Sequence, residues 1–178
     1  MKIWSAIDIE NQIPQIRQAV LAATTKLGIE NLTQALTLHV SLRITFDIPD
    51  QISDQVIQAI KHYLSSIKSF TFNPSHIECQ ENIIWIRMHD CPCLTEVHQG
   101  LCQMLQAKFS VPLMEFDNCF IFHSTLALFD SNEKASQLFS HLKDLELPTT
   151  LTAKTFLIGT SETGDLSDLH TVYTGPFA

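Results

Sequence analysis

The stretch LHVSLRITF, residues 38–46, places polar and apolar side chains at alternate positions. Successive side chains of a β-strand point to opposite faces of the sheet, so this stretch predicts a strand with one polar and one apolar face. His39, Ser41 and Arg43 share the polar face. The apolar face is ordinary core material and carries Val40, Leu42, Ile44 and Phe46. A polar face of this composition on an otherwise apolar strand indicates a functional site.

A second stretch, DNCFIFHSTLALF at residues 117–129, repeats this arrangement. It also predicts a strand, in which His123 is followed two residues later by the hydroxyl of Thr125. The two histidines are 84 residues apart (123 − 39), close to half of the 178-residue chain. We therefore expect the two strands to occupy equivalent places in an internal repeat.

Hydrophobic periodicity in the rest of the chain predicts four helices and several further strands. The helices are expected to begin near Asn11, Asp50, Pro92 and Ser131, and Gly28 is expected to end the first of them. The strands are expected at residues 2–9, 37–46, 117–129, 149–160 and 168–177, with a hairpin over 69–88 that turns at 80–82. After the first strand, the order helix, strand, helix, strand, strand thus occurs twice.

This order of elements predicts an α+β fold rather than a doubly wound parallel sheet, because the hairpins pair their strands antiparallel. We expect a single domain over residues 1–178 with mixed or antiparallel sheets. Its two lobes should be built around residues 37–88 and 117–177 and be related by a pseudo-two-fold axis. The two histidine strands would then face each other across a central groove.

The charge balance restricts the partners of the protein. With 19 acidic and 11 basic residues the chain has a net charge of −8, a poor match for long duplex nucleic acid, whose phosphates require a surplus of Lys and Arg. A small nucleotide or an RNA end in a local pocket remains compatible with this charge. The chain lacks an apolar run long enough to span a membrane, and MKIWSAIDIE does not resemble a signal peptide. We expect a cytoplasmic monomer with reduced cysteines.

Two histidines and two hydroxyls around one small volume suit the chemistry of a phosphodiester. A neutral histidine can take a proton from water or a ribose hydroxyl, while a protonated histidine gives one to the leaving oxygen. The hydroxyls can donate hydrogen bonds to the non-bridging oxygens, where negative charge develops. An unperturbed histidine pKa lies close to neutrality, so both protonation states are accessible. This scheme needs no metal ion and no cofactor.

The paired motifs HVSL at 39–42 and HSTL at 123–126 resemble the signatures of the two-histidine phosphoesterase superfamily, in particular its bacterial 2'-5' RNA ligase and 2',3'-cyclic phosphodiesterase branch. Element order, motif spacing and the strand IIWIRM extend the resemblance over nearly the whole chain. The resemblance implies a two-lobed fold with His39 and His123 as the acid–base pair and Ser41 and Thr125 as phosphate ligands. It implies activity on RNA ends or small nucleotides with a 2',3'-cyclic phosphate, with 2'-5' ligation as the reverse reaction.

The chain departs from the pattern of that family at the second motif. Many members have proline before the second histidine, where this chain has Phe122, and many carry an arginine soon after the motif, where Ala127 and Leu128 stand here. The nearest basic residue in a motif position is Arg43. It is therefore a candidate phosphate ligand, although a partner carboxylate at the edge of the core would account for it equally well.

Other interpretations compete with this one. The two histidines could be buried, hydrogen-bonded structural residues, or the groove could bind a nucleotide or RNA end without cleaving it. Trp85 and Phe129 could stack on a base, although aromatic residues in strands are more often part of the core. Glu115 and Asp117 precede the second motif and could orient a histidine, although a solvated loop is the simpler expectation.

A metal site is also conceivable in HDCPCLTEVHQGLC, residues 89–102. Three cysteines and two histidines lie close together in this stretch. Zinc sites usually separate paired cysteines by two to four residues, whereas only Pro92 separates Cys91 from Cys93. We therefore do not assign a metal to this segment.

Overall fold

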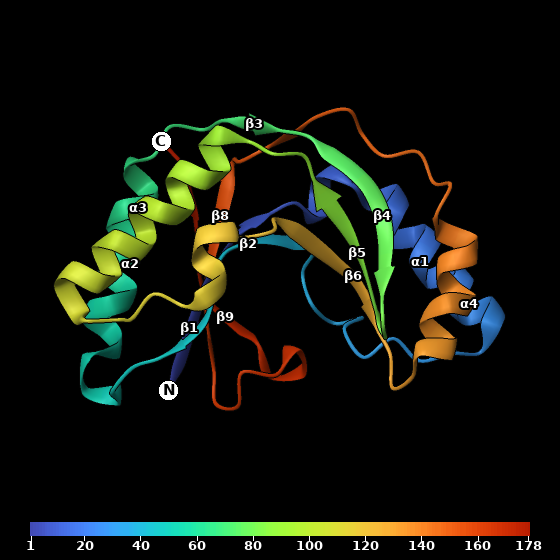
Figure 1. Ribbon diagram of the computed structural model, residues 1–178, viewed down its shortest axis with the longest axis horizontal. Helices are drawn as coiled ribbons and strands as arrows, with labels where there is room; N and C mark the ends of the chain where they lie inside the picture. Colours follow the sequence, from blue (N-terminus) through green and yellow to red (C-terminus); the bar gives the residue numbers. More distant parts are fainter.

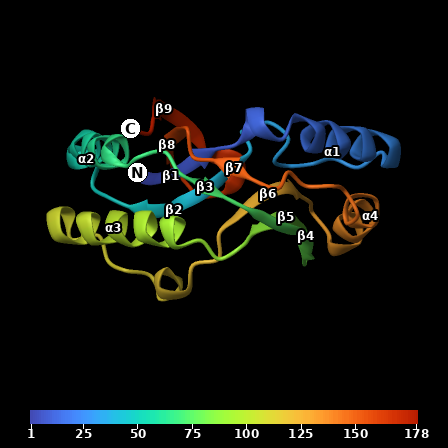
Figure 2. The ribbon, with the colours of Figure 1, turned by 90° about the horizontal axis from the view of Figure 1, so that it is seen from above.

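The computed structural model describes residues 1–178, apart from the side chain of Ser167. Its elements form an arch with helices α2 and α3 at one end and α1 and α4 at the other, and the strands lie between these pairs (Figures 1 and 2). The helices are α1 (Pro14–Leu27), α2 (Ser53–Ser66), α3 (Pro92–Phe109) and α4 (Asn132–Leu142). The strands are β1 (Lys2–Asp8), β2 (His39–Asp47), β3 (Thr71–Phe72), β4 (Pro74–Gln80), β5 (Ile83–Met88), β6 (His123–Leu128), β7 (Leu151–Thr152), β8 (Thr155–Ser161) and β9 (His170–Pro176).

The strands form two main sheets in which all pairs are antiparallel. The first sheet has the order β2-β1-β8-β9 and packs against α2 and α3. The second has the order β4-β5-β6 and packs against α1 and α4. The two-residue strands β3 and β7 form a separate pair. The predicted α+β class and the repeated order of elements are confirmed.

The composition of the lobes differs from the sequence-based expectation. We predicted lobes around residues 37–88 and 117–177, but β2 joins the sheet of β8 and β9, and β6 joins the sheet of β4 and β5. Each histidine strand is therefore in one sheet with the hairpin of the other half. Periodicity along the chain identifies strands, but it carries no information about which distant strand supplies their hydrogen-bonding partners.

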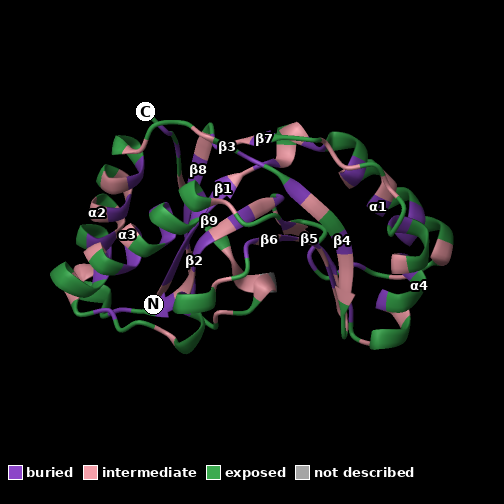
Figure 3. Ribbon diagram, turned by 45° about the horizontal axis from the view of Figure 1, so that its top comes forward, coloured by how far each residue is buried: buried purple, intermediate pink, exposed green. Residues whose placement is uncertain are grey.

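The core forms because each helix and strand presents one apolar side to its neighbours. In α2 the buried residues Val56, Ile60 and Leu64 recur at helical spacing, whereas in β5 the buried residues Ile84 and Ile86 alternate with half-buried ones. Figure 3 shows the buried positions of the helices on the sides that face the sheets. Burying an Ile or Leu side chain contributes roughly 1.5–3 kcal/mol, so these faces hold the helices in place. No helix among the described residues has the length and hydrophobicity needed to span a membrane.

Several predicted boundaries shift by a few residues. Gly28 ends α1 in a left-handed conformation, and the Ser131 hydroxyl caps α4 by accepting from the Lys134 amide, both as predicted. Asn11 is not the cap of α1, because residues 10–12 form a short 3₁₀ turn and the helix begins at Pro14. The second histidine strand begins at His123 rather than 117, because residues 115–119 form another 3₁₀ turn.

Candidate active site

The two histidine strands share an irregularity of the backbone. Strands β2 and β6 approach each other where the two sheets meet. Ala6 of β1 is opposite Ser41 of β2, and the preceding residue of β1, Ser5, is opposite Arg43. Leu42 of β2 is therefore an extra residue in the ladder. The same slip makes Leu126 an extra residue in β6. A bulge of this kind interrupts the alternation of side chains just after each motif hydroxyl.

The bulge explains why Arg43 is not on the polar face predicted for it. Its side chain is only 1% exposed, forms an ion pair with the buried Asp117 and donates a second hydrogen bond to the Pro112 carbonyl at 3.0 Å. Arg43 therefore has the structural role that we considered as the alternative to phosphate binding, and Asp117 is not part of a solvated loop. Ile44, predicted to lie in the core, is half-buried instead and lines the groove.

The four remaining motif side chains lie around one cavity of about 250 Å³. His39 and Ser41 come from β2, and His123 and Thr125 come from β6. The other lining residues are largely apolar: Trp4, Ile44, Thr45, Ile83, Trp85, Gly164, Leu166 and Leu169. The structure thus brings the pair His39 and Ser41 together with the pair His123 and Thr125, 84 residues later in the chain. Arg43 does not line this cavity.

Both imidazoles are held in the same orientation by the backbone. Nδ1 of His39 lies 2.7 Å from the Thr37 carbonyl oxygen, and Nδ1 of His123 lies 2.8 Å from the Ile121 carbonyl oxygen. A carbonyl only accepts hydrogen bonds, so Nδ1 carries the proton in the neutral ring and Nε2 is the nitrogen free to exchange one. Among the described residues, Nε2 has no hydrogen-bonding partner in either ring.

Each motif histidine also packs against a tryptophan of the neighbouring strand. Trp4 of β1 stacks on His39 with ring centroids 5.2 Å apart, and the ring centroid of Trp85 of β5 lies 4.1 Å from that of His123. Trp4 can lie there because Gly159 of β8 leaves room, since a Cβ at that position would be 2.1 Å from Trp4 Cε2. Trp85 is half-buried and faces the cavity, whereas Phe129 is a core residue.

Burial lowers the pKa of both histidines, because a partly enclosed site disfavours the charged imidazolium. The carbonyl bonded to each Nδ1 opposes this effect. The positive charge of a protonated His123 lowers the pKa of His39 further, while the Asp8 carboxylate raises it. For His123, the Glu78 carboxylate raises the pKa and the Arg87 guanidinium lowers it. The two rings therefore have different charged neighbours.

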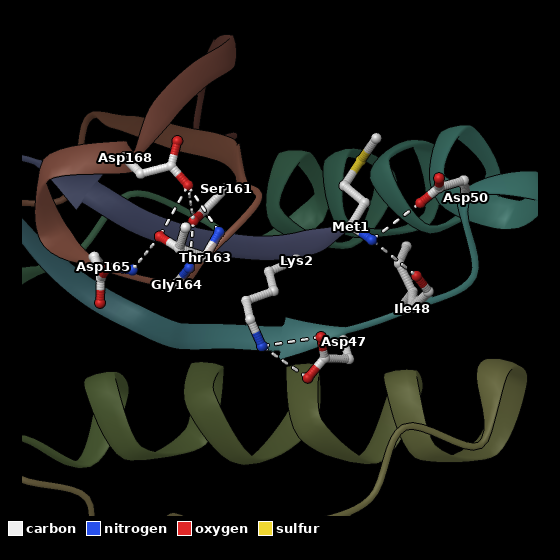
Figure 4. A network of polar contacts seen from close by, with 10 residues as sticks. All are labelled: Met1, Lys2, Asp47, Ile48, Asp50, Ser161, Thr163, Gly164, Asp165 and Asp168. Carbon is white, nitrogen blue, oxygen red and sulfur yellow. Dashed lines mark hydrogen bonds and ion pairs between the residues drawn. The ribbon is translucent and has the colours of Figure 1, made fainter.

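One wall of the cavity is a loop between β8 and β9 that contributes Gly164, Leu166 and Leu169. The Asp168 carboxylate organises this loop by accepting hydrogen bonds from the Thr163 amide at 2.8 Å and from the Ser161 hydroxyl at 2.9 Å (Figure 4). It also accepts one from the Glu162 amide at 2.8 Å. These donors hold the pKa of Asp168 well below its usual range. Gly164 has a φ of +93° that disfavours other residues, and it packs on Lys2.

Neither sequence reasoning nor motif spacing identified Trp4 and the loop around Asp168 as parts of the site, or Arg87 as a neighbour of His123. Trp4 and Arg87 lie on β1 and β5, which are the pairing partners of the motif strands. Only the alternation of β5 offered a signal, since Trp85 and Arg87 share one face of that strand. Without knowledge of the pairing, that face could not be connected to His123.

The segment 89–102, to which the sequence analysis assigned no metal, contributes part of one cluster of potential ligands. Among the described residues, His98, Cys102 and Asp117 bring three such groups close together. Both nitrogens of His98 already face backbone carbonyls, at 2.7 Å from Leu42 and 3.1 Å from Asp117. Burial raises the pKa of the Cys102 thiol to about 11, and the Asp117 carboxylate is paired with Arg43. These residues therefore suit a hydrogen-bonded core network better than a metal site.

Comparison with solved structures shows the same fold in several proteins. The chain aligns with TT0787 of Thermus thermophilus over 99% of its length and 98% of that protein, at 15% identity and a TM-score of 0.64. E. coli LigT, solved in complex with NADP+, aligns over 99% of this chain and 96% of that one, at 13% identity and a TM-score of 0.61. Usb1 of Kluyveromyces marxianus matches at 14% identity and a TM-score of 0.52, over 96% of this chain and 97% of that one.

A search of curated protein sequences finds no match to this chain. A family model does match, however: the 2'-5' RNA ligase superfamily, over residues 7–165. That range contains both histidine motifs and all the strands of the second sheet. The resemblance noted from the two motifs is confirmed, and the chain belongs to the 2'-5' RNA ligase superfamily of two-histidine phosphoesterases.

Proposed function

We propose that this protein is a metal-independent phosphodiesterase that opens 2',3'-cyclic phosphates on RNA ends or small nucleotides. The observation that carries the proposal is the cavity in which two histidines, each with a free Nε2, lie together with the hydroxyls of Ser41 and Thr125. A volume of about 250 Å³ is suited to a phosphate and part of its ribose rather than to a folded RNA.

The reaction follows from the protonation states of the two rings. One histidine is neutral and takes a proton from a water molecule as the water oxygen forms a bond to phosphorus. The other is protonated and gives its proton to the ribose oxygen as the bond from that oxygen to phosphorus breaks. The hydroxyls of Ser41 and Thr125 donate hydrogen bonds to the non-bridging oxygens, which gain negative charge in the transition state. If the 5'-hydroxyl of a second RNA takes the place of water, the same groups can join two RNA ends: the 5' oxygen forms a bond to phosphorus, and the 3' oxygen leaves with the proton of the second histidine, which gives a 2'-5' bond.

Structures of the same fold support a phosphate-bearing ligand. E. coli LigT has been solved in complex with phosphate and with 3'-AMP, at 14% and 12% identity to this chain. We transfer from these complexes only the expectation that a nucleotide phosphate enters the groove between the lobes.

The test is hydrolysis of the four nucleoside 2',3'-cyclic monophosphates in the presence of a chelator, with products separated by chromatography. We expect turnover by the wild-type protein and a loss of about 10²- to 10⁴-fold in His39→Ala and in His123→Ala. His62→Ala serves as the matched control, because His62 is exposed on α2 and lines no part of the cavity. Wild-type rates in both motif variants would contradict the proposal.

A second candidate function is binding without cleavage, as a sensor of nucleotides or RNA ends. It is favoured by the absence of Lys and Arg among the described residues that line the cavity. Calorimetric titration with nucleoside monophosphates separates the two functions. Binding without turnover, lost in the Ser41→Ala, Thr125→Ala double variant, would support this candidate, whereas no heat with any nucleotide would exclude it.

A further inference from the structure

Arg87 is the basic residue placed closest to the histidine pair by the strand register. It lies on β5 directly opposite His123 of β6. Half-buried residues of β5 alternate with buried ones, so Arg87 and Trp85 share the face that carries the cavity. Side chains opposite each other in antiparallel strands have Cβ atoms only about 5 Å apart. The extended side chain of an arginine is long enough to reach the position of a phosphate at the Nε2 of that histidine.

The guanidinium of Arg87 is loosely held in this structure. Its side chain is 37% exposed, and its nearest carboxylate oxygen, Oε1 of Glu78, is 4.0 Å from Nη1, which is too far for a hydrogen bond. Oε1 of Glu78 is instead the acceptor for the indole N–H of Trp85. By contrast, Arg43 is engaged in the core and Arg17 is paired with Glu10. Arg87 is therefore available to a ligand.

A second cavity of about 240 Å³ adjoins this position. Arg87 lines it together with Ile121 and Phe122, the two residues that lead into His123. Arg87 does not line the cavity that contains the histidines, but the strand register places it next to His123 at the edge of that cavity. Its positive charge is close enough to His123 to lower the pKa of that ring.

The two halves of the site differ in the charge beside each histidine. The residue opposite His39 is Asp8, and the residue opposite His123 is Arg87. The Asp8 carboxylate would repel a bound phosphate on the His39 side, whereas on the His123 side the Arg87 guanidinium would attract it against the opposing charge of Glu78. This asymmetry favours a phosphate whose non-bridging oxygens face β5 and β6.

We infer that Arg87 is a phosphate-binding residue of the two-histidine site and takes the place of the arginine that the second motif lacks at Leu128. The inference rests on the proposed function, because it assigns a cation to the same phosphate. When a phosphate enters, Arg87 forms charge-assisted hydrogen bonds to it. The ligand of the site is therefore an anionic phosphoester, and its charge is balanced from β5 rather than from β6.

The experiment measures the affinity for adenosine 3'-monophosphate by calorimetry in the wild-type protein, Arg87→Gln and Arg87→Lys. We expect binding to weaken roughly 10- to 100-fold in Arg87→Gln, the scale for a lost hydrogen bond to a charged group. Arg87→Lys should recover part of this loss, because lysine keeps the charge but not the two-pronged geometry. Lys68→Gln makes the same change in net charge at an exposed residue that lines neither cavity and should bind normally.

Glu78→Gln provides a second control, because it removes the negative charge beside Arg87 instead of the positive charge of Arg87 itself. If Arg87 acted only through its contact with Glu78, both variants would weaken binding alike, whereas the inference predicts equal or tighter binding once Glu78 no longer competes for the guanidinium. The proton titration of His123, followed by NMR, should move to higher pH in Arg87→Gln and to lower pH in Glu78→Gln.

Each outcome is decisive. Wild-type affinity in Arg87→Gln would overturn the role of Arg87 and leave the proposed function standing. Binding that depends on Arg87 without turnover of any cyclic phosphate would support the role of Arg87 and overturn only the hydrolytic function. A wild-type protein that hydrolyses a cyclic phosphate but does not bind adenosine 3'-monophosphate would overturn the role of Arg87 in binding this phosphate and leave the proposed function standing.

Discussion

His39 and His123 share one arrangement, in which Nδ1 is bonded to a carbonyl two residues earlier and Nε2 is free for the proton transfers of the proposed reaction. Burial lowers the pKa of both below the ordinary value of 6.5. The general base becomes active as pH rises through its pKa, and the general acid becomes inactive as pH rises through its own. Because the pKa values of the base and of the acid both lie below 6.5, kcat/KM should peak at a mildly acidic pH.

This prediction is checked by measuring kcat/KM for a nucleoside 2',3'-cyclic monophosphate from about pH 4.5 to 9. The pH dependence of kcat/KM gives the pKa values of the acid and the base in the free enzyme. The expected curve is a bell whose alkaline limb already falls near neutrality. A maximum above about pH 7.5 would mean that the desolvation of the rings does not govern their titration.

Gly159 controls the position of His39 without touching a substrate. A methyl group there would collide with the Trp4 ring, which stacks on His39. Gly159→Ala should therefore cost about 1–3 kcal/mol of stability through overpacking and reduce kcat by up to about 10²-fold through a misplaced imidazole. Urea denaturation and turnover measurements give the two quantities.

Gly100→Ala is the matched control for this variant. Its added Cβ would lie 2.1 Å from the hydroxyl of Tyr63, between α2 and α3 and away from the cavity. We expect it to lower stability while kcat is unchanged. An equal loss of kcat in both variants would show that overpacking in general, and not the contact between Trp4 and His39, affects the reaction.

At the scale of elements, the bulge in β2 turns Arg43 into the core, where it joins the strand to the 3₁₀ turn at 115–119. Asp117 is the acceptor of this ion pair and also accepts a hydrogen bond from the Met114 amide at 2.7 Å. The turn ends at Cys119, shortly before β6 begins at His123. The ion pair therefore connects β2 with the segment that leads into β6.

Removing one partner of the ion pair between Arg43 and Asp117 should destabilise the protein more than replacing both partners. Asp117→Ala leaves a buried, unpaired guanidinium and should lower the free energy of unfolding by about 3–5 kcal/mol, whereas the double variant Arg43→Met, Asp117→Ala should recover part of this loss. Urea denaturation of the single and double variants is the measurement. A double variant as unstable as the sum of its single changes would contradict the coupling.

For the molecule as a whole, the exchange of histidine strands between the halves makes the two lobes interdependent. A cut between β5 and α3 would leave β1 and β2 without β8, and β4 and β5 without β6. Fragments 1–90 and 91–178 should each lack a cooperative thermal transition when expressed alone. Co-expressed, they should form a complex that unfolds cooperatively.

Circular dichroism during heating distinguishes these states. The intact chain provides the reference for the cooperative transition of the complex. A cooperative transition in either fragment by itself would show that one half completes a core without the other, which the strand order does not allow.

The sequence by itself determined the class of fold, the order of elements and the four groups of the candidate site. Alternation and helical periodicity are local properties, and the histidine and hydroxyl at i and i+2 share a face in any regular strand. For this reason His39, Ser41, His123 and Thr125 could be predicted to meet once the two strands were treated as equivalents.

Only the tertiary structure decided which sheet each histidine strand joins, where Arg43 points and which other residues surround the rings. Pairing between β5 and β6 placed Arg87 and Trp85 beside His123, and pairing of β1 with β2 and β8 placed Trp4 over Gly159 and against His39. A bulge arises from the register with a neighbouring strand, so the same residues in an unpaired strand would have kept their alternation. Contacts of this kind depend on segments far apart in the chain, and local patterns carry no record of them.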